Sequence, residues 1–184
     1  DKAHEAARRV VADPPGVDEH DGATLVAQHD RPFVNYYGFP KTYYCDDFEE
    51  QDDFLLETCM YFPFITAKNL TGFGPDHSRL MQAFPRLQMI LVLACDKAIP
   101  ENRVTVNRQG KPVVHYRITP EVIRSMVRAT RASARIFFAA GAERVHAPSA
   151  NPHLIERKDA TRVDELIHER HFQLGKISIS AAHL

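Results

Sequence analysis

The chain has 184 residues, which is enough to bury the core of one domain and short for two. Hydrophobic residues make up 44% and charged residues 26%, a balance that excludes a disordered or fibrous chain. With 23 Lys and Arg against 24 Asp and Glu, the net charge of −1 leaves no basic field for a nucleic acid partner.

The first 30 residues are predicted to form a helix and a connection. Apolar residues recur at helical spacing between Ala3 and Val11, and two prolines and a glycine at positions 14–16 end that helix. The residues that follow, to about His29, predict a mobile connection. Residues 31–44 mix aromatic residues with a glycine and two prolines, which predicts a loop with short extended pieces.

Two apolar stretches in the middle of the chain predict strands. The first, FLLETCMYFPF, follows an acidic cluster at residues 46–53, is rich in aromatic residues and ends at Pro63. The second, LQMILVLAC, is a continuous apolar run that predicts a central, fully buried strand. The glycines and prolines of residues 66–85 predict a loop with a short helix near residues 78–84.

The clearest local signals lie in the second half of the chain. RVTVNRQGKPVVHYRI contains two β-branched runs joined by an Asn and Gly turn, which predicts a β-hairpin. Thr119 is placed to cap a helix that starts at Pro120 and ends at Gly141. The predicted inward stripe of this helix is Ile123, Val127, Thr130, Ala134 and Phe137, with a solvated row beside it of Arg124, Arg128, Arg131 and Arg135. Residues 160–172 predict a second helix, and GKISISAAHL predicts a closing strand.

These elements together predict an α+β fold. Strands outnumber helices and come in neighbouring hairpin-like pairs, and the sequence shows no internal repeat. We expect a mostly antiparallel sheet covered on one face by helices. Residues 1–30 are expected to form an N-terminal extension and residues 31–184 a single domain.

Glu57 is the first candidate catalytic residue. It stands in the middle of an apolar predicted strand, where a carboxylate is costly unless it is neutralised or paired. Desolvation raises the pKa of a carboxyl group, which makes it a better general base. Strand alternation places Leu55, Cys59 and Tyr61 on the same face, and these three are candidates for binding an apolar substrate. The alternative is an edge-strand glutamate whose head group reaches water.

His183 is the second candidate, since an imidazole exchanges protons near neutral pH. The alternative is an exposed terminal histidine. No metal site is predicted, because His168 and His171 have no third ligand at workable spacing and the acidic cluster lacks the central glycine of a calcium loop. The glycine motifs of dinucleotide and phosphate sites are also absent, so no cofactor-binding residue is assigned.

The sequence also carries signals about the cellular compartment of the protein. The longest unbroken apolar run, residues 89–95, is too short for a membrane helix, and no signal peptide is recognisable. Cys45, Cys59 and Cys95 show no C-x-x-C spacing, which fits reduced thiols. We expect no membrane span and a cytoplasmic or other reducing setting.

Three stretches together resemble one family, the glucose-methanol-choline flavin oxidoreductases. FLLETCMYFP resembles the strand that carries the catalytic glutamate of cholesterol oxidases and the matching strand of long-chain fatty alcohol oxidases. Residues 102–145 resemble the hairpin and helix of the C-terminal region of the family, and SAAHL resembles the start of its active-site histidine motif. The resemblance covers residues 31–184 in order.

This resemblance implies that the chain is the substrate-binding portion of an FAD-dependent alcohol oxidase or dehydrogenase. Glu57 and His183 match the catalytic carboxylate and histidine, which remove the hydroxyl proton of an alcohol while hydride passes to the flavin. The apolar neighbours of Glu57 favour an aliphatic or sterol-like alcohol. Because the flavin-binding motif is absent, FAD is expected on a flavin-binding domain of the same polypeptide, and the chain alone is expected to be inactive. Leu184 departs from the family, in which many members have proline there.

Two other interpretations remain open. A non-catalytic binding or interaction module with the same α+β fold would leave Glu57 exposed or away from His183. A stand-alone α+β protein unrelated to flavoenzymes would hold the two residues far apart, with no cleft between them.

Overall fold

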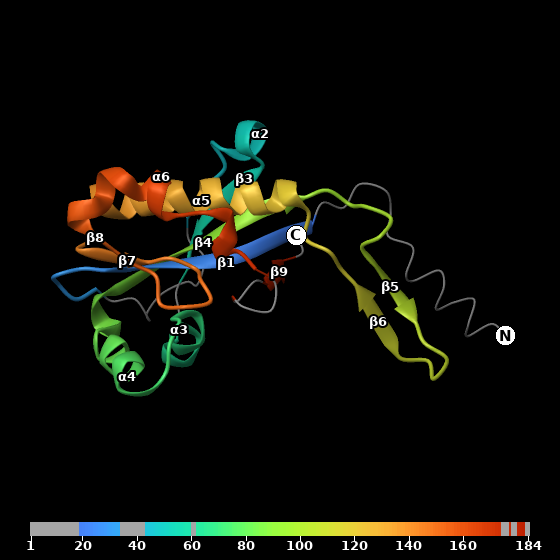
Figure 1. Ribbon diagram of the computed structural model, residues 1–184, viewed down its shortest axis with the longest axis horizontal. Coiled ribbons are helices and arrows are strands. Elements are labelled where there is room, and N and C mark those ends of the chain that lie inside the picture. Colours follow the sequence, from blue (N-terminus) through green and yellow to red (C-terminus); the bar gives the residue numbers. More distant parts are fainter. Residues whose placement is uncertain (1–18, 34–42, 60–61, 174–176, 178–179, 183–184) are drawn as a thin grey trace.

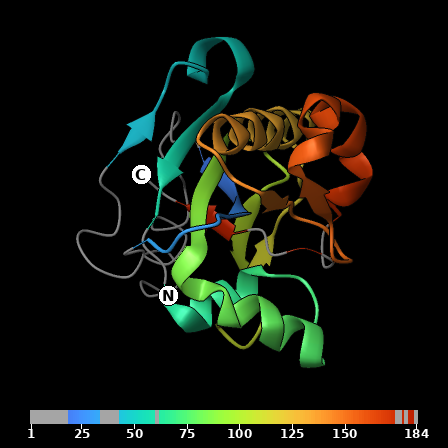
Figure 2. The ribbon, with the colours of Figure 1, turned by 90° about the vertical axis from the view of Figure 1, so that its left-hand side faces the viewer.

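The computed structural model describes residues 19–33, 43–59, 62–173, 177 and 180–182. The helix predicted at residues 3–11 lies outside these ranges. One sheet forms the middle layer, with helices α5 (Pro120–Ala139) and α6 (Val163–Leu166) on one face and α3 (Pro63–Asn69) and α4 (Gly74–Gln82) on the other (Figures 1 and 2). The predicted α+β class with a mostly antiparallel sheet is confirmed.

The sheet of the described residues has seven strands, and every pair in it is antiparallel. Its order is β2-β3-β4-β1-β7-β8, with β9 also paired to β1. The strands are β1 (Glu19–Gln28), β2 (Tyr44–Cys45), β3 (Phe54–Thr58), β4 (Leu87–Asp96), β7 (Arg144–His146), β8 (Leu154–Glu156) and β9 (Ser180–Ala182). The two longest strands, β1 and β4, therefore lie side by side at the centre.

The prediction of a mobile connection up to His29 is wrong, because residues 19–28 form strand β1. All ten residues of β1 pair with β4, from Glu19 opposite Asp96 to Gln28 opposite Leu87. The prediction was wrong because a strand buried on both faces loses the alternation of polar and apolar residues that marks a strand in sequence. The charged residues at the start of β1 also resemble those of a loop.

Strands β3 and β4 lie where the two apolar stretches predict them. The prediction for β4 is confirmed, since its position between β3 and β1 makes it a central strand and most of its residues are buried. The first stretch forms a shorter strand than predicted, because β3 ends at Thr58 and Pro63 begins helix α3. Proline suits the first turn of a helix, where its missing N–H is not needed.

The segment predicted as a loop with one short helix contains more helix than expected. Helices α3 and α4 are followed by the 3₁₀ helix η1 (Phe84–Arg86), and each of the three has a proline in its first turn. Prolines end the predicted strand at Pro63 and predict a loop in residues 66–85, whereas in the structure they lie in the first turns of helices. The end of α3 and the residues after α4 pack on the sheet, where Leu70 and Ala83 join Val26, Leu87 and Met89 in a buried cluster.

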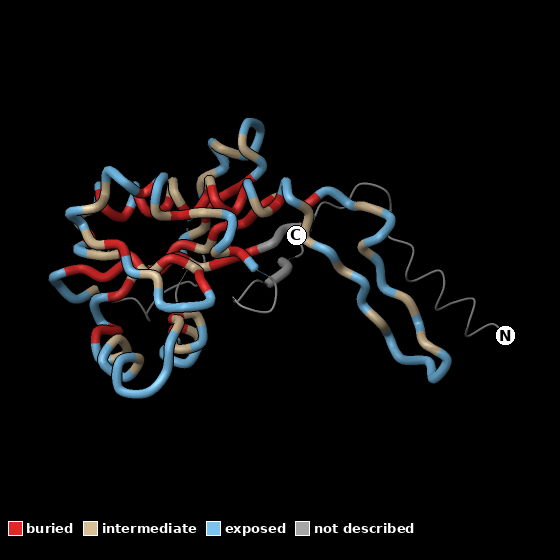
Figure 3. Tube along the Cα trace, in the orientation of Figure 1, coloured by how far each residue is buried: buried red, intermediate tan, exposed pale blue. Residues whose placement is uncertain are grey.

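The predicted β-hairpin is confirmed as a separate two-stranded sheet of β5 (Arg103–Val106) and β6 (Pro112–His115). In its turn, Oδ1 of Asn107 accepts hydrogen bonds from the N–H groups of Gln109 and Lys111, and Gly110 has a φ of 78°. The hairpin projects away from the rest of the described chain, and most of its residues are exposed (Figures 1 and 3).

Helix α5 begins and ends as its sequence predicts. Thr119 accepts a hydrogen bond from the N–H of Val122 at 3.3 Å, Pro120 is the first helical residue, and Gly141 has a φ of 94° just beyond the helix. Of the predicted inward stripe, Val127, Thr130, Ala134 and Phe137 are buried and Ile123 is partly buried. This face packs on the side chains of the sheet that point toward α5.

The elements after α5 are shorter than predicted. The second helix, predicted over residues 160–172, is divided into the 3₁₀ helix η2 (Arg157–Arg162), the single turn of α6, and the 3₁₀ helix η3 (Glu169–His171).

The acidic cluster contains the short helix α2 (Glu49–Asp52), which is tied to α5 because Oγ of Ser125 donates to the carbonyl oxygens of Asp52 and Asp53 at 3.0 and 2.6 Å.

Candidate functional site

Glu57 lies on the sheet face that points away from helix α5. Its strand neighbours Phe54 and Leu56 belong to the core cluster beneath α5. Because successive side chains of a strand point to opposite faces, Leu55 and Glu57 lie on the other face. The predicted grouping of Glu57 with Leu55 is therefore supported by the packing of the strand.

The strand register places Glu57 in a row of four side chains. Glu57 pairs with Tyr44 on β2 and with Leu91 on β4, and Leu91 pairs in turn with Thr24 on β1. Directly paired residues of antiparallel strands have their side chains on the same face. Tyr44, Leu91 and Thr24 were missed by sequence reasoning, because no pattern in the sequence states which residues lie opposite each other.

The surroundings of Glu57 are apolar on the sheet side and open at the edge. Leu55 is 7% exposed and Leu93 is 1% exposed, whereas Tyr44 on the edge strand is 70% exposed. Glu57 itself is half-buried, and its Oε2 atom is shielded from solvent. The structure thus positions a carboxylate between a buried apolar surface and an accessible aromatic ring, an arrangement suited to an apolar molecule with one polar group.

The remaining predicted site residues have different outcomes. Cys59 lies just beyond the end of β3, and its sulfur is 4.0 Å from the backbone carbonyl oxygen of Glu57. Tyr61 and His183 lie outside the described residues. The last described strand, β9, ends at Ala182, which pairs with His20 of β1. Whether a histidine joins Glu57 therefore stays a prediction.

His146 is a second ionisable side chain on the same face of the sheet, and sequence reasoning missed it. Val26 pairs with both Met89 and His146, so these three share a face, while Val145 belongs to the core cluster on the side of α5. Burial, with a smaller effect of the Arg144 charge, lowers the pKa of His146 to about 4. The imidazole is therefore neutral at physiological pH.

His146 and Glu57 are too far apart to act on one proton. The strand order puts two strands, β4 and β1, between them. At the usual spacing of strands, three steps across the sheet correspond to about 14 Å. His146 could contact only the distant part of a molecule that binds at Glu57.

Comparison with models of known protein families gave no match, and comparison with curated protein sequences gave none either. The resemblance to glucose-methanol-choline oxidoreductases therefore rests on the three sequence stretches alone. Across the described residues, none of the helices combines the length and apolar character that crossing a bilayer requires.

The described part of the chain does not fit a dinucleotide cofactor. Of its positive-φ glycines, one precedes α4, one is the first residue of α4, one lies in the hairpin turn and one follows α5. A dinucleotide cradle requires glycines in a turn from a strand into a helix, where the backbone approaches the phosphates. No group of three or more His, Cys, Asp or Glu side chains within the described ranges is arranged to hold a metal ion.

Proposed function

We propose that this chain supplies the substrate-facing wall of an FAD-dependent alcohol oxidase or dehydrogenase, with Glu57 as the base that accepts the hydroxyl proton. The observation that carries the proposal is the position of Glu57, half-buried on the apolar sheet face opposite α5. The sequence stretches that resemble glucose-methanol-choline oxidoreductases support it independently. The substrate is a hydrophobic alcohol, aliphatic or sterol-like.

The residues around Glu57 account for substrate binding and for proton removal. Leu91, which is partly buried, lies next to Glu57 on the neighbouring strand and provides apolar surface for the substrate body. Leu55 lies two residues from Glu57 on the same face and is buried behind this surface. The hydroxyl group donates a hydrogen bond to the carboxylate and then transfers its proton to it. An apolar surrounding keeps competing water away from this hydrogen bond and strengthens it. Tyr44 stands at the open edge, where the substrate enters.

Oxidation of an alcohol to a carbonyl compound also requires an acceptor for the hydride that leaves the carbon. When bound, FAD supplies that acceptor. Since the described residues do not fit a dinucleotide, the flavin is held by a flavin-binding domain of the same polypeptide, which approaches Glu57 beside α3 and α4 on the same face of the sheet. The chain alone is inactive in this proposal, and its location is the cytoplasm or another reducing setting.

The test is Glu57→Gln in the polypeptide that contains this chain together with its flavin-binding part. Flavin reduction by a long-chain primary alcohol or a sterol is followed by stopped-flow absorbance. Because glutamine keeps the shape of the side chain and removes the proton acceptor, we expect the reduction rate to fall by about 10²- to 10⁴-fold while the substrate Kd changes little.

The matched control is Glu101→Gln, which removes an exposed carboxylate outside the Glu57 row. It should leave both the reduction rate and the Kd unchanged. Equal losses of rate and affinity in Glu57→Gln would contradict a role as base and favour the alternative, a binding module that has the same fold and no catalytic carboxylate.

A further inference from the structure

A cleft of about 500 Å³ lies on the side of the sheet opposite to Glu57, between α5 and the segment around η3. Its lining consists of Arg124, Val127, Arg128 and Arg131 from α5, and of His168, Glu169 and Arg170. The lining therefore includes four arginines and one glutamate. Because α5 covers the other face of the sheet, this cleft is separate from the site proposed for the alcohol.

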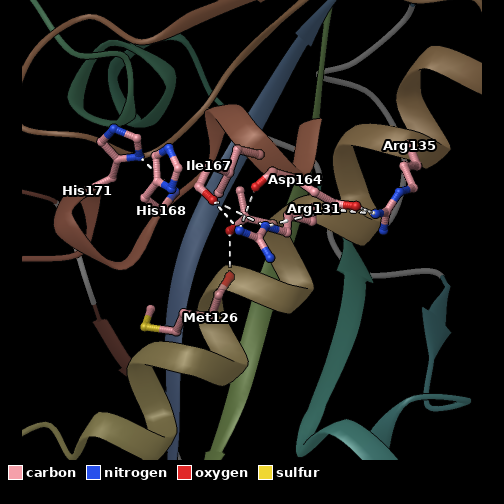
Figure 4. A network of polar contacts seen from close by, with 8 residues as sticks. Met126, Arg131, Arg135, Asp164, Ile167, His168 and His171 are labelled. Carbon is pink, nitrogen blue, oxygen red and sulfur yellow. Dashed lines mark hydrogen bonds and ion pairs between the residues drawn. The ribbon is translucent and has the colours of Figure 1, made fainter. Parts of the chain in front are cut away.

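Arg131 is held in place mainly by neutral groups. Its Nε and one terminal nitrogen donate to the carbonyl oxygen of Ile167 at 3.2 and 2.7 Å, and the terminal nitrogen also donates to the carbonyl oxygen of Asp164 at 2.7 Å (Figure 4). The carboxylate of Asp164 lies 3.7 Å from Nε of Arg131 and is shared with Arg135, which binds both of its oxygens. One carboxylate therefore balances two guanidinium groups at this end.

The other three arginines that line the cleft differ in how far nearby carboxylates balance their charges. Arg128 donates to the carbonyl oxygen of Asp52 at 2.7 Å and forms an ion pair with its carboxylate at 3.0 Å. Arg124 pairs with Glu121 at 2.7 Å, but both side chains are exposed, and such surface pairs contribute little. Within the described part of the chain, no ion pair or hydrogen bond is found for the guanidinium of Arg170.

These contacts involve Nε and one terminal nitrogen of Arg128 and of Arg131, and they leave the second terminal nitrogen of each available to donate a hydrogen bond. A guanidinium has five N–H donors in a planar fork that matches the oxygens of a phosphate. The volume of the cleft is within the range of small-molecule sites. Glu169 repels any anion, but four arginines outnumber it in the lining, and their attraction grows with the negative charge of the ligand. A ligand with two or more negative charges is therefore favoured over a simple carboxylate.

We propose that this cleft binds a multiply charged phosphate group, either a free diphosphate or the phosphate of a small organic phosphate. Arg124 and Arg170 contact the anion directly from two sides, and the remaining terminal nitrogens of Arg128 and Arg131 donate hydrogen bonds from the floor of the cleft. The sequence presents the arginines of α5 as a solvated row, and only the approach of Arg170 from a distant segment makes a site of them. This inference does not depend on the proposed oxidoreductase function.

The experiment is a calorimetric titration of the 184-residue chain with inorganic diphosphate, inorganic phosphate and adenosine monophosphate at constant ionic strength. We expect saturable binding of one anion per chain. Tighter binding of adenosine monophosphate than of phosphate would indicate an organic phosphate as the ligand, and tighter binding of diphosphate would indicate the free anion. A charge-assisted hydrogen bond contributes about 1.5–3 kcal/mol, so Arg170→Gln and Arg124→Gln should each weaken binding by about tenfold or more.

The matched control is Arg79→Gln on α4, which removes an exposed arginine paired with Asp76 and lying outside the cleft. It should bind the anion as the unchanged chain does. Because Arg124 and Arg170 are exposed, their replacement should not unfold the chain, and thermal unfolding of each variant verifies this. Absence of saturable binding, or equal weakening by Arg79→Gln and Arg170→Gln, would overturn the proposal.

Discussion

Tyr116 donates a hydrogen bond to Oδ2 of Asp96 at 2.7 Å, and this contact joins the projecting hairpin to the end of the central strand β4. Asp96 is 3% exposed, and burial raises the pKa of its carboxyl group. We expect Tyr116→Phe to lower the free energy of unfolding by about 1–2 kcal/mol, because a buried acceptor loses its hydrogen bond. Urea unfolding followed by circular dichroism measures the change.

The control for that variant is Tyr43→Phe, since Tyr43 is 74% exposed and its hydrogen bonds to Thr58 come from the backbone. Its free energy of unfolding should stay within about 0.5 kcal/mol of the unchanged chain. If Tyr116→Phe were equally neutral, the contact with Asp96 would not hold the hairpin to β4.

Four histidines make the fold sensitive to acid, because burial lowers the pKa of each of them, His29 included. Burial lowers the pKa of His146 and of His171 to about 4, and it also lowers the pKa of His153, whose ring lies 4.3 Å from that of His171. In the unfolded chain these groups take up protons below about pH 6.5, whereas in the folded chain they remain neutral until lower pH. Their neutral forms therefore favour the folded state above pH 6.5, and this stability is lost as the pH falls toward 4.

We expect the free energy of unfolding to decrease between pH 7 and pH 5, with about 2 kcal/mol of the decrease due to His146 alone. Urea unfolding at a series of pH values measures the slope, which His146→Gln should reduce. A free energy of unfolding that is constant over this range, or a slope unchanged in that variant, would show that the imidazole of His146 is not kept neutral by burial.

Tyr44 and Tyr43 are adjacent in sequence but point to opposite faces of the sheet. Tyr44 pairs with Glu57, while the carbonyl oxygen of Tyr43 accepts from the N–H and Oγ1 of Thr58, and the N–H of Tyr43 donates to that Oγ1. In the enzyme proposed above, Tyr44→Ala should raise the KM for a hydrophobic alcohol several-fold and change kcat little. The reason is that the substitution removes apolar contact surface whose burial contributes up to about 2–3 kcal/mol to binding. Tyr43→Ala is the matched control and should leave KM unchanged. Steady-state kinetics measure KM and kcat for both variants. An equal rise of KM in the two variants would contradict substrate binding on the Glu57 face.

Where the chemistry of neighbouring residues decides the local structure, the sequence was sufficient to predict it. Thr119 and Pro120 start α5, and the glycine at 141 ends it, because each residue acts on the backbone within one turn. The hairpin turn was also predictable, since its side-chain and glycine requirements are local. The class of the fold followed from these signals together.

The missed elements share a different cause. Strand β1 is recognisable only when β4 lies on one side of it and β7 and β9 on the other, because burial on both faces removes its alternation. Where residues 160–172 are divided, Arg131 donates to the carbonyl oxygens of Asp164 and Ile167, which a continuous helix would use internally, and this contact with a distant segment cannot be seen in the local sequence.

The same distinction applies to the candidate sites. By itself, the sequence determined that Glu57 stands in an apolar strand with Leu55 on its face, because strand alternation is a local property. Only the tertiary structure decided that Tyr44, Leu91 and Thr24 form one row with it, and that Arg170 approaches the arginines of α5. Register and the meeting of distant segments depend on the packing of the whole core, which short-range sequence patterns do not encode.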